Sequence, residues 1–310
     1  MDFRDEQDEE GAFVRQEDAF RKWVSSDGSS EYPAEAGRYH LYVSLACPWA
    51  HRTVIIRKLK QLESVIGMTV LDPIRDERGW AFREGSGHGK DPVNHFHYLS
   101  EAYRASKPGF DGRVTVPVLW DKKTGRIVNN SEDDITRMFN SAFNAFTESA
   151  LDIYPEALRP EIDAMIEIIY PNINNGVYKA GFATRQAVYE KEVLQLFETL
   201  DQLENRLSKH RYLVGNQLTE ADWRLFPTLI RFDAVYHGHF KCNIRRIADY
   251  PHLQAYMKEI YQYDHVAGTV NFDHIKRHYY VTHTDINPTQ IVPLGPVLDL
   301  TSPHGREKLV

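Results

Sequence analysis

The chain has 310 residues, a net charge of −7, 42% hydrophobic residues and 26% charged residues. This balance is typical of a globular protein with one large domain or two ordinary ones. It argues against a nucleic-acid-binding protein, which usually has a basic face. No stretch reaches the ~18 apolar residues of a transmembrane helix. Residues 1–10 carry six acidic side chains where a signal or transit peptide would be basic. We therefore expect a cytoplasmic protein that does not bind membranes.

The first part of the chain predicts an α/β domain behind a polar arm. Residues 1–37 are broken by Gly and Pro and form the expected N-terminal arm. Residues 39–45 are rich in aromatic and β-branched side chains and predict a strand. Between Pro48 and Leu62 the apolar residues recur at helical spacing and predict a helix. Residues 68–73 predict a second strand. A strand, a helix and a strand within this length predict a parallel βαβ unit.

A second, antiparallel pair of strands completes this domain. Residues 75–97 predict an irregular loop, and its Gly-rich run 85–89 lacks the Lys-Ser/Thr of a phosphate-binding loop. We expect a helix over 98–105, strands at 115–120 and 126–128 joined by a hairpin loop, and a helix around 135–139. Residues 38–145 therefore predict one compact α/β domain.

The rest of the chain predicts an all-helical domain at 150–283 and an extended tail at 284–310. Apolar residues recur at helical spacing over 193–207, 225–232 and 253–260, and no β-rich run lies between 155 and 278. Thr219 and Asp222 form a capping box before one of these helices, which is a structural feature. Several prolines follow residue 283.

Cys47 is the first candidate for chemistry, because it stands where the first predicted helix begins. Unpaired N–H groups and the helix dipole at that end favour an anion and lower a thiol pKa. Position 50, where a C-x-x-C motif has its second Cys, is Ala. A disulfide formed by Cys47 would therefore use an external thiol. The alternative interpretation is a buried structural cysteine.

Val116 and Pro117 are the second candidate, because they open a predicted strand. A cis-Pro there would leave the preceding backbone groups to pair with a peptide-like ligand. An ordinary trans-Pro at a strand start is the alternative.

The other histidines and the second cysteine give weaker indications of a functional site. His95 and His97, and His237 and His239, have the spacing of one strand face, but no acidic or Cys partner is placed by the sequence, so we expect no metal site. Cys242 lacks a helix-start signal, so we expect it to be non-catalytic.

These features in this order resemble the glutathione transferase architecture, a thioredoxin-like N-terminal domain followed by an all-α domain. More specifically, the chain resembles the glutathionyl-hydroquinone reductases, the Xi class of that superfamily, over residues 11–283. The resemblance is carried by segments 13–16, 44–52, 76–82, 113–121 and 176–183, which include Cys-Pro-Trp-Ala, Gly-Trp and Gly-Val-Tyr.

The resemblance implies a reaction and a set of site residues. The Cys that matches Cys47 takes the thiol from a thiol-adduct hydroquinone as a mixed disulfide, and a second thiol resolves it. The resemblance assigns thiol binding to Trp80, Arg113 and Val116 beside Pro117, and to the helix start at Ser131 and Glu132. It assigns the aromatic substrate pocket to Tyr178 and Tyr279, for which core packing is the alternative. It also implies a homodimer.

The helix start departs from the family pattern. The family has Glu-Ser there, whereas this chain has Ser131-Glu132 followed by Asp133 and Asp134. Three acidic residues there would repel a carboxylate, so the identity of the thiol co-substrate stays open. It is glutathione or another low-molecular-weight thiol, such as mycothiol or γ-glutamylcysteine. The physiological quinone and the role of the tail stay open.

A protein with this architecture can also be a conjugating transferase or a non-enzymatic interaction module. A general conjugating transferase usually activates the thiol with a Ser or Tyr hydroxyl, and Cys47 argues against it. A non-enzymatic interaction module can lose its nucleophile, and the presence of Cys47 argues against that also.

Overall fold

The computed structural model describes residues 6–309, which form two compact units. The first unit contains residues 16–152 and 268–284, and the second contains residues 6–15, 153–267 and 285–309. The sequence-based boundaries differ in two places. Residues 268–283, predicted in the helical domain, belong to the first unit, and the predicted arm is divided after Arg15. Both differences arise from contacts between segments far apart in the chain.

The first unit is built on a mixed four-stranded sheet in the order β4-β3-β5-β6. β3 pairs with β4 in parallel, and β3–β5 and β5–β6 are antiparallel, which confirms the predicted βαβ and ββα order. Its elements are β3 (Tyr39–Val43), α1 (Pro48–Leu59), β4 (Gly67–Val70), α2 (Leu99–Ser106), β5 (Val118–Asp121), β6 (Arg126–Asn129) and α3 (Glu132–Ser141).

Some elements are shorter than the sequence predicts. Helix α1 ends at Leu59 because Gln61 adopts a left-handed φ of 53°, which helix interiors exclude, and Leu62 is buried beyond it. Strand β5 begins at Val118 because Pro117 has no N–H for the sheet.

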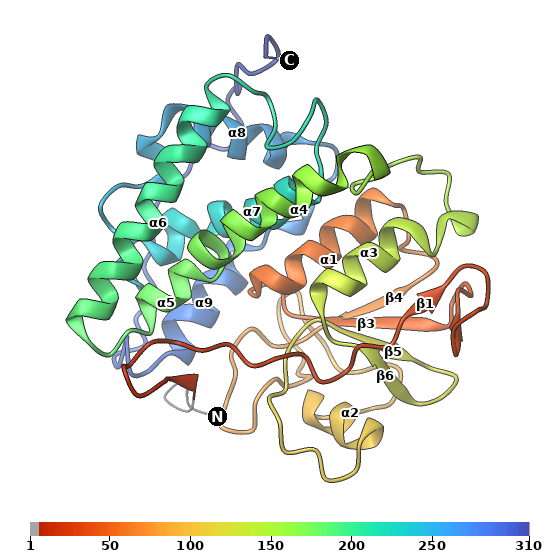
Figure 1. The fold of residues 1–310 in the computed structure, drawn as a ribbon. Helices are drawn as coiled ribbons and strands as arrows, with labels where there is room; N and C mark the ends of the chain where they lie inside the picture. The colour runs from red at the N-terminus through yellow and green to blue at the C-terminus, as the bar shows by residue number, and fades with distance from the viewer. Residues whose placement is uncertain (1–5, 310) are drawn as a thin grey trace. The chain divides into compact units, whose positions relative to one another are not determined.

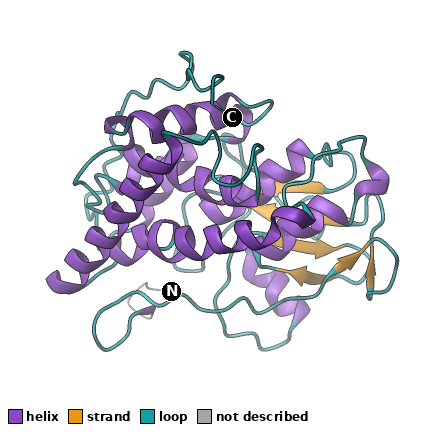
Figure 2. Ribbon diagram, turned by 45° about the horizontal axis from the view of Figure 1, so that its top comes forward, coloured by secondary structure: helices purple, strands orange, loops and turns teal. Residues whose placement is uncertain are grey.

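Helices cover both faces of the sheet. Helices α1 and α3 lie side by side on one face, and α2 lies on the other (Figure 1). Every residue of β3 is buried, as expected for a central strand that is covered on both sides. The strands, shown in orange in Figure 2, gather in one cluster.

The arm protects the edge of the sheet. Lys22 N–H donates to the Val128 carbonyl (3.0 Å), and Asn130 N–H donates to the Phe20 carbonyl (3.1 Å). Edge strand β6 is therefore covered rather than exposed. The arm then forms a short parallel pair, β1 (Val24–Ser25) with β2 (Tyr32–Pro33).

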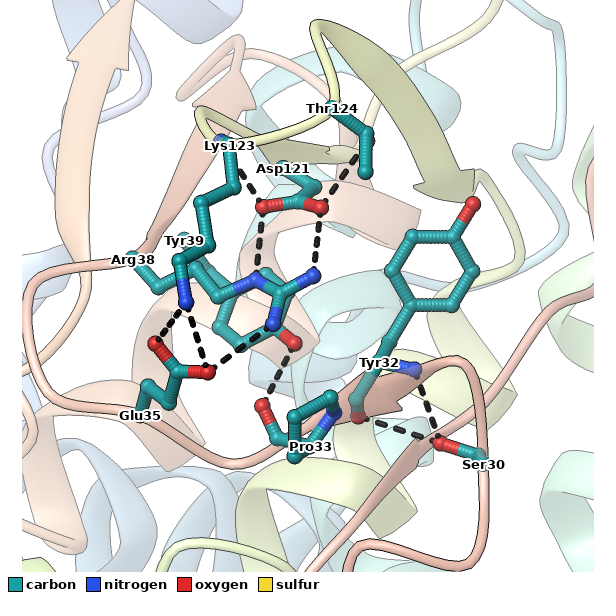
Figure 3. Close-up of polar contacts among 9 residues, drawn as sticks. All are labelled: Ser30, Tyr32, Pro33, Glu35, Arg38, Tyr39, Asp121, Lys123 and Thr124. Carbon is teal, nitrogen blue, oxygen red and sulfur yellow. Dashed lines mark hydrogen bonds and ion pairs between the residues drawn. The ribbon is translucent and has the colours of Figure 1, made fainter.

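A buried ion pair joins the start of β3 to the end of β5 (Figure 3). The Arg38 guanidinium donates to both carboxylate oxygens of Asp121 at 2.8 Å. Glu35 contacts Arg38 and Lys123 at the rim of this network. Burial alone would raise the pKa of Asp121, but hydrogen bonds from Arg38, Lys123 N–H and Thr124 outweigh it and lower that pKa.

The loop between β4 and α2 contains no helix or strand, as predicted. Buried Asp91 organises part of it by accepting hydrogen bonds from the backbone N–H groups of Val93, Asn94 and Phe96. Its carboxylate also accepts the Tyr42 hydroxyl from β3 at 2.9 Å, so the loop is tied to the sheet.

The second unit is helical. It contains α4 (Arg159–Ile169), a π-helical turn (Tyr170–Asn174), α5 (Gly176–Gly181), α6 (Gln186–Leu207), α7 (Glu220–Arg231) and α8 (Pro251–Gln262). Among the described residues between 155 and 278 there is no strand, which confirms that prediction. The capping box is also confirmed, since Thr219 N–H donates to the Asp222 carboxylate at 2.7 Å. Helix α9 (Phe272–Thr282) belongs to the first unit.

The tail has no helix or strand over the residues described, and its end is anchored on the second unit. The buried Arg306 side chain donates to the Glu259 carboxylate and to the carbonyls of Leu207, His210 and Arg211. Across residues 6–309, none of the helices combines the length and apolar character needed to cross a membrane.

Candidate functional site

Cys47 lies at the junction of β3 and α1, as the sequence predicts. It is the N-cap residue of α1, with extended backbone, and Pro48 occupies the first turn. Its N–H donates to the Ser44 carbonyl at 3.1 Å and its carbonyl accepts the His51 N–H at 3.0 Å. Cys47 is half-buried, and neither Cys47 nor Cys242 forms a disulfide. A sulfur at this position lies at the positive end of the helix dipole, which favours the thiolate.

The segment before β5 faces this sulfur. The Cys47 Sγ donates to the Val116 carbonyl at 3.7 Å. The Val116–Pro117 peptide bond is cis, the less common of the two alternatives considered above. Neighbouring Thr115 is held by Tyr103 and by Asn130, whose amide donates to its Oγ1 at 3.0 Å. Two of the predicted site residues, Val116 and Pro117, thus lie beside Cys47.

The start of α3 also contacts α1, the helix that follows Cys47. Ser131 is the N-cap residue, and its N–H donates to the Asn129 side chain at 2.7 Å. Arg52 of α1 lies 3.1 Å from the Glu132 carboxylate and 3.4 Å from that of Asp133. Its guanidinium also lies 4.5 Å from the Trp49 ring centroid.

The third acidic residue has its own partners. Asp134 forms a two-pronged ion pair with Arg21 of the arm, with one contact at 2.8 Å, and accepts the Asn129 amide at 2.9 Å. From the sequence alone, the three acidic residues at this helix start have no visible cationic partner. In the structure two guanidinium groups offset much of that charge, so the repulsion of a carboxylate is weaker than expected.

Glu132 titrates above the usual range of a carboxyl. Burial, followed by the charge of Asp133, raises the pKa of Glu132 to about 7, and Arg52 opposes this shift. The charge at the start of α3 therefore changes near neutral pH.

Trp80 is a buried aromatic residue that stacks on α9. Its ring lies 5.1 Å from the His278 ring at an interplanar angle of 15°, and the Arg75 guanidinium lies 5.4 Å from its centroid. His278 Nδ1 is 2.6 Å from the Pro73 carbonyl. Sequence reasoning did not single out His278, and its only signal was its position beside Tyr279.

Two further residues of the first unit, Arg113 and Tyr279, are predicted to bind the thiol and the aromatic substrate. Arg113 is in the segment between α2 and β5 and is half-buried. Tyr279, on α9, is buried, with its ring 5.2 Å from that of His278 and 5.4 Å from that of His283. Their roles stay predictions.

Tyr178 lies on α5 in the second unit, within an aromatic cluster. Its ring centroid lies 5.5 Å from Phe240, 6.0 Å from Tyr236 and 6.1 Å from Phe182. The Arg15 guanidinium is 5.2 Å from the same centroid. Arg15 was part of a motif that carried the resemblance, but the sequence assigned it no role.

The other reactive residues do not assemble into a site. Among the residues described, no group of three or more His, Cys, Asp or Glu side chains is arranged to hold a metal ion. Burial lowers the pKa of His239 to about 4. Burial raises the pKa of the Cys242 thiol far above its usual range, so this sulfur is a poor nucleophile.

The sequence and the fold match known proteins. The family model "Glutathione S-transferase, N-terminal domain" matches residues 46–142, and "Glutathione S-transferase, C-terminal domain" matches residues 186–259. Glutathionyl-hydroquinone reductase YqjG of Escherichia coli is 51% identical over 304 residues, covering 96% of this chain and 93% of the relative. The chain belongs to the glutathionyl-hydroquinone reductases of the glutathione transferase superfamily.

Solved structures agree with this family. The glutathione-bound structure of YqjG has a TM-score of 0.92 and 52% identity, covering 94% of this chain and 96% of that chain. A Xi-class transferase from Natrialba magadii also has a TM-score of 0.92, with 48% identity over 94% of this chain and 89% of that chain. The resemblance and the fold class predicted from the sequence, a thioredoxin-like domain followed by a helical region, are thus confirmed.

Proposed function

We propose that this chain reduces S-glutathionyl-hydroquinones to free hydroquinones through a mixed disulfide on Cys47. The observation that carries the proposal is the place of this sulfur at the start of α1, with Ala50 where a resolving cysteine would stand. A thiolate held there attacks the sulfur of the adduct, and no local thiol competes with the external one.

The two steps balance in atoms and electrons. Cys47 Sγ bonds to the adduct sulfur, the aryl C–S bond breaks, and its electron pair passes to the ring, which takes up one proton. A second thiolate then attacks the glutathionyl sulfur and releases Cys47 as a thiolate. One adduct and one thiol thus become one hydroquinone and one disulfide.

We propose that the thiol binds along Trp80, Arg113, Val116 and the start of α3 at Ser131 and Glu132. Free N–H groups at a helix start favour a carboxylate. Arg52, which offsets the charge of Glu132 and Asp133, supports a carboxylate-bearing thiol such as glutathione or γ-glutamylcysteine over a purely neutral ligand. Two relatives that are named glutathionyl-hydroquinone reductases support the choice of glutathione.

For the aromatic substrate, we propose Tyr178 and Tyr279 as the phenols that contact the hydroquinone. A phenol donates a hydrogen bond to a ring oxygen and packs its own ring on an apolar partner. Homodimer formation and a cytoplasmic location stay predictions, and light scattering of the purified chain tests the first.

The test is the reduction of glutathionyl-menadiol by wild type, Cys47→Ala and Cys242→Ala, with glutathione, mycothiol or γ-glutamylcysteine as co-substrate. We expect Cys47→Ala to lose activity by about a thousandfold or more, as removal of a nucleophile does. Cys242→Ala is the matched control and keeps its activity.

A single-turnover experiment identifies the intermediate. Wild type mixed with the adduct, without a second thiol, gains the mass of one glutathionyl group on the peptide that contains Cys47. Full activity of Cys47→Ala, or modification elsewhere, would contradict the mixed-disulfide route and favour a conjugating transferase.

A further inference from the structure

The N-terminal residues 6–15 form a hairpin on the helical unit. Val14 N–H donates to the Glu6 carbonyl at 2.7 Å, and Gln7 and Phe13 form an antiparallel bridge. The Asp8 carboxylate accepts the Ala12 N–H at 2.9 Å and so closes the turn. These residues are at the red end of the colour scale in Figure 1. The segment therefore has a defined structure of its own.

Three contacts dock this hairpin at the end of α5 and the start of α6. The Gln7 amide donates to the Phe182 carbonyl at 2.8 Å, and the Thr184 N–H donates to the Gly11 carbonyl at 3.3 Å. Arg185 donates to the Glu9 carbonyl at 2.9 Å. These contacts come from the first arm and the turn of the hairpin, and the pairing of the two arms then holds its last residues in place.

Phe13 and Arg15, at the end of the hairpin, both contact the ring of Tyr178. Phe13 is buried and stacks on the Tyr178 ring at 6.4 Å with an angle of 29°. The Arg15 guanidinium lies 5.2 Å from the Tyr178 ring centroid, and Arg15 Nε donates to Asn175 Oδ1 at 3.1 Å. A cation within about 6 Å of a ring centroid is attracted to the ring face.

Arg15 is thus fixed from two directions. Asn175 is the residue that precedes α5, so its side chain is attached to the same helix as Tyr178. The hydrogen bond to Asn175 orients the guanidinium, and the ring of Tyr178 lies under it. A change at Arg15 therefore affects both the Tyr178 ring and the side chain at the start of the helix that carries it.

We infer that Arg15 is a positioning residue for the hydroquinone, acting through Tyr178. This inference rests on the proposed function. When the aryl C–S bond breaks, electron density moves onto the ring and its oxygens before the ring carbon is protonated. A phenol that donates to such an oxygen stabilises this charge, and a nearby cation strengthens that donor. Arg15 also prevents the Tyr178 ring from turning away.

The experiment compares Arg15→Gln, Arg15→Lys and Arg185→Gln in the full-length chain. Arg185→Gln is the matched control, because it removes a guanidinium that docks the same hairpin through the Glu9 carbonyl rather than through the Tyr178 ring. We expect Arg15→Gln to raise KM for glutathionyl-menadiol about fivefold to tenfold, because the phenol that orients the bound ring is less well held. We also expect it to lower kcat about fivefold to tenfold, because the developing charge loses part of its stabilisation. KM for the resolving thiol and the Arg185→Gln constants should stay within about twofold of wild type. Arg15→Lys should lie between wild type and Arg15→Gln.

A second measurement separates this inference from the proposed reaction. In the Cys47→Ala background, where no turnover occurs, calorimetry compares the binding of glutathionyl-menadiol with that of S-methylglutathione. Arg15→Gln should weaken only the first, and it should have no further effect when Tyr178 is already Phe. If wild type fails to turn over the adduct, the reaction is wrong, but this binding comparison still tests Arg15.

Two results would overturn the inference. One is equal binding of the adduct with and without Arg15. The other is an Arg185→Gln variant that matches Arg15→Gln, which would mean that hairpin docking alone is responsible.

Discussion

Arg52 of α1 lies 3.1 Å from the carboxylate of Glu132 at the start of α3, so the helix that follows Cys47 is tied to the proposed thiol-binding turn. The Arg52 side chain is 2% exposed. This contact joins two segments that the sequence treats as separate features. At the proposed thiol-binding turn, we expect it to set the charge that a thiol carboxylate would meet.

Replacing Arg52 should cost both stability and thiol binding. Arg52→Met leaves two carboxylates at the helix start without their cation, and loss of one partner of a buried pair costs about 3–5 kcal/mol. Urea denaturation measures the free energy of unfolding. Adding Glu132→Gln should recover part of the loss. The control Arg21→Met removes the more exposed partner of Asp134 and should cost about 1 kcal/mol or less. Equal losses in both variants would contradict this interpretation.

The affinity for a carboxylate-bearing thiol should fall as the pH rises from 6 to 8. Because the pKa of Glu132 is raised to about 7, its carboxyl is mostly neutral at pH 6 and mostly ionised at pH 8. Ionisation adds a negative charge near the ligand carboxylate and draws on Arg52, which weakens binding by ~1 kcal/mol, or about fivefold. Calorimetry with S-methylglutathione, which has no thiol to titrate, measures this. Glu132→Gln should show a flat profile, and a slope that survives in this variant would exclude Glu132 as its source.

The buried pair Arg38–Asp121 should stabilise the sheet. Asp121→Asn leaves a buried guanidinium without its carboxylate, at a cost of about 3–5 kcal/mol in the free energy of unfolding. Since the pKa of Asp121 is lowered on folding, the wild-type advantage is present at neutral pH and disappears as the pH falls through that lowered pKa. Lys123→Gln, at the exposed rim of the network in Figure 3, serves as the control and should shift the urea midpoint little. A pH-independent difference would show that charge is not the cause.

The buried ammonium of Lys60 should anchor the segment that follows α3. It donates to Asn144 Oδ1 and to the Leu151 carbonyl, each at 2.8 Å. Lys60→Met leaves these acceptors unsatisfied, which should cost about 2–3 kcal/mol of unfolding free energy. Lys58→Met, two residues earlier and exposed, should cost about 0.5 kcal/mol or less. Hydrogen exchange should show faster opening of residues 144–151 only in the first variant, and similar exchange in both would rule out the anchoring role.

Local pattern was sufficient for much of this protein. The spacing of apolar residues predicted α1 and α6, and the aromatic and β-branched composition of residues 39–45 predicted β3, because each signal lies within one segment of the chain. Cys47 was found in the same way, since a helix start is a local feature that Pro48 marks. The capping box at Thr219 likewise lies within four residues of chain. Each of these signals can be read without knowing what the segment packs against.

Contacts between distant segments were decided only by the tertiary structure. Arg52 meets Glu132 across 80 residues, and Arg15 meets Asn175 across 160. Trp80 stacks on His278, and α9 joins the first unit rather than the helical one. A charged or aromatic side chain has no period that reveals its partner, because its partner depends on how the two segments pack. The sequence by itself determined the family, most of the elements and the place of Cys47 at a helix start, whereas only packing determined the charge around the start of α3 and the surroundings of Tyr178.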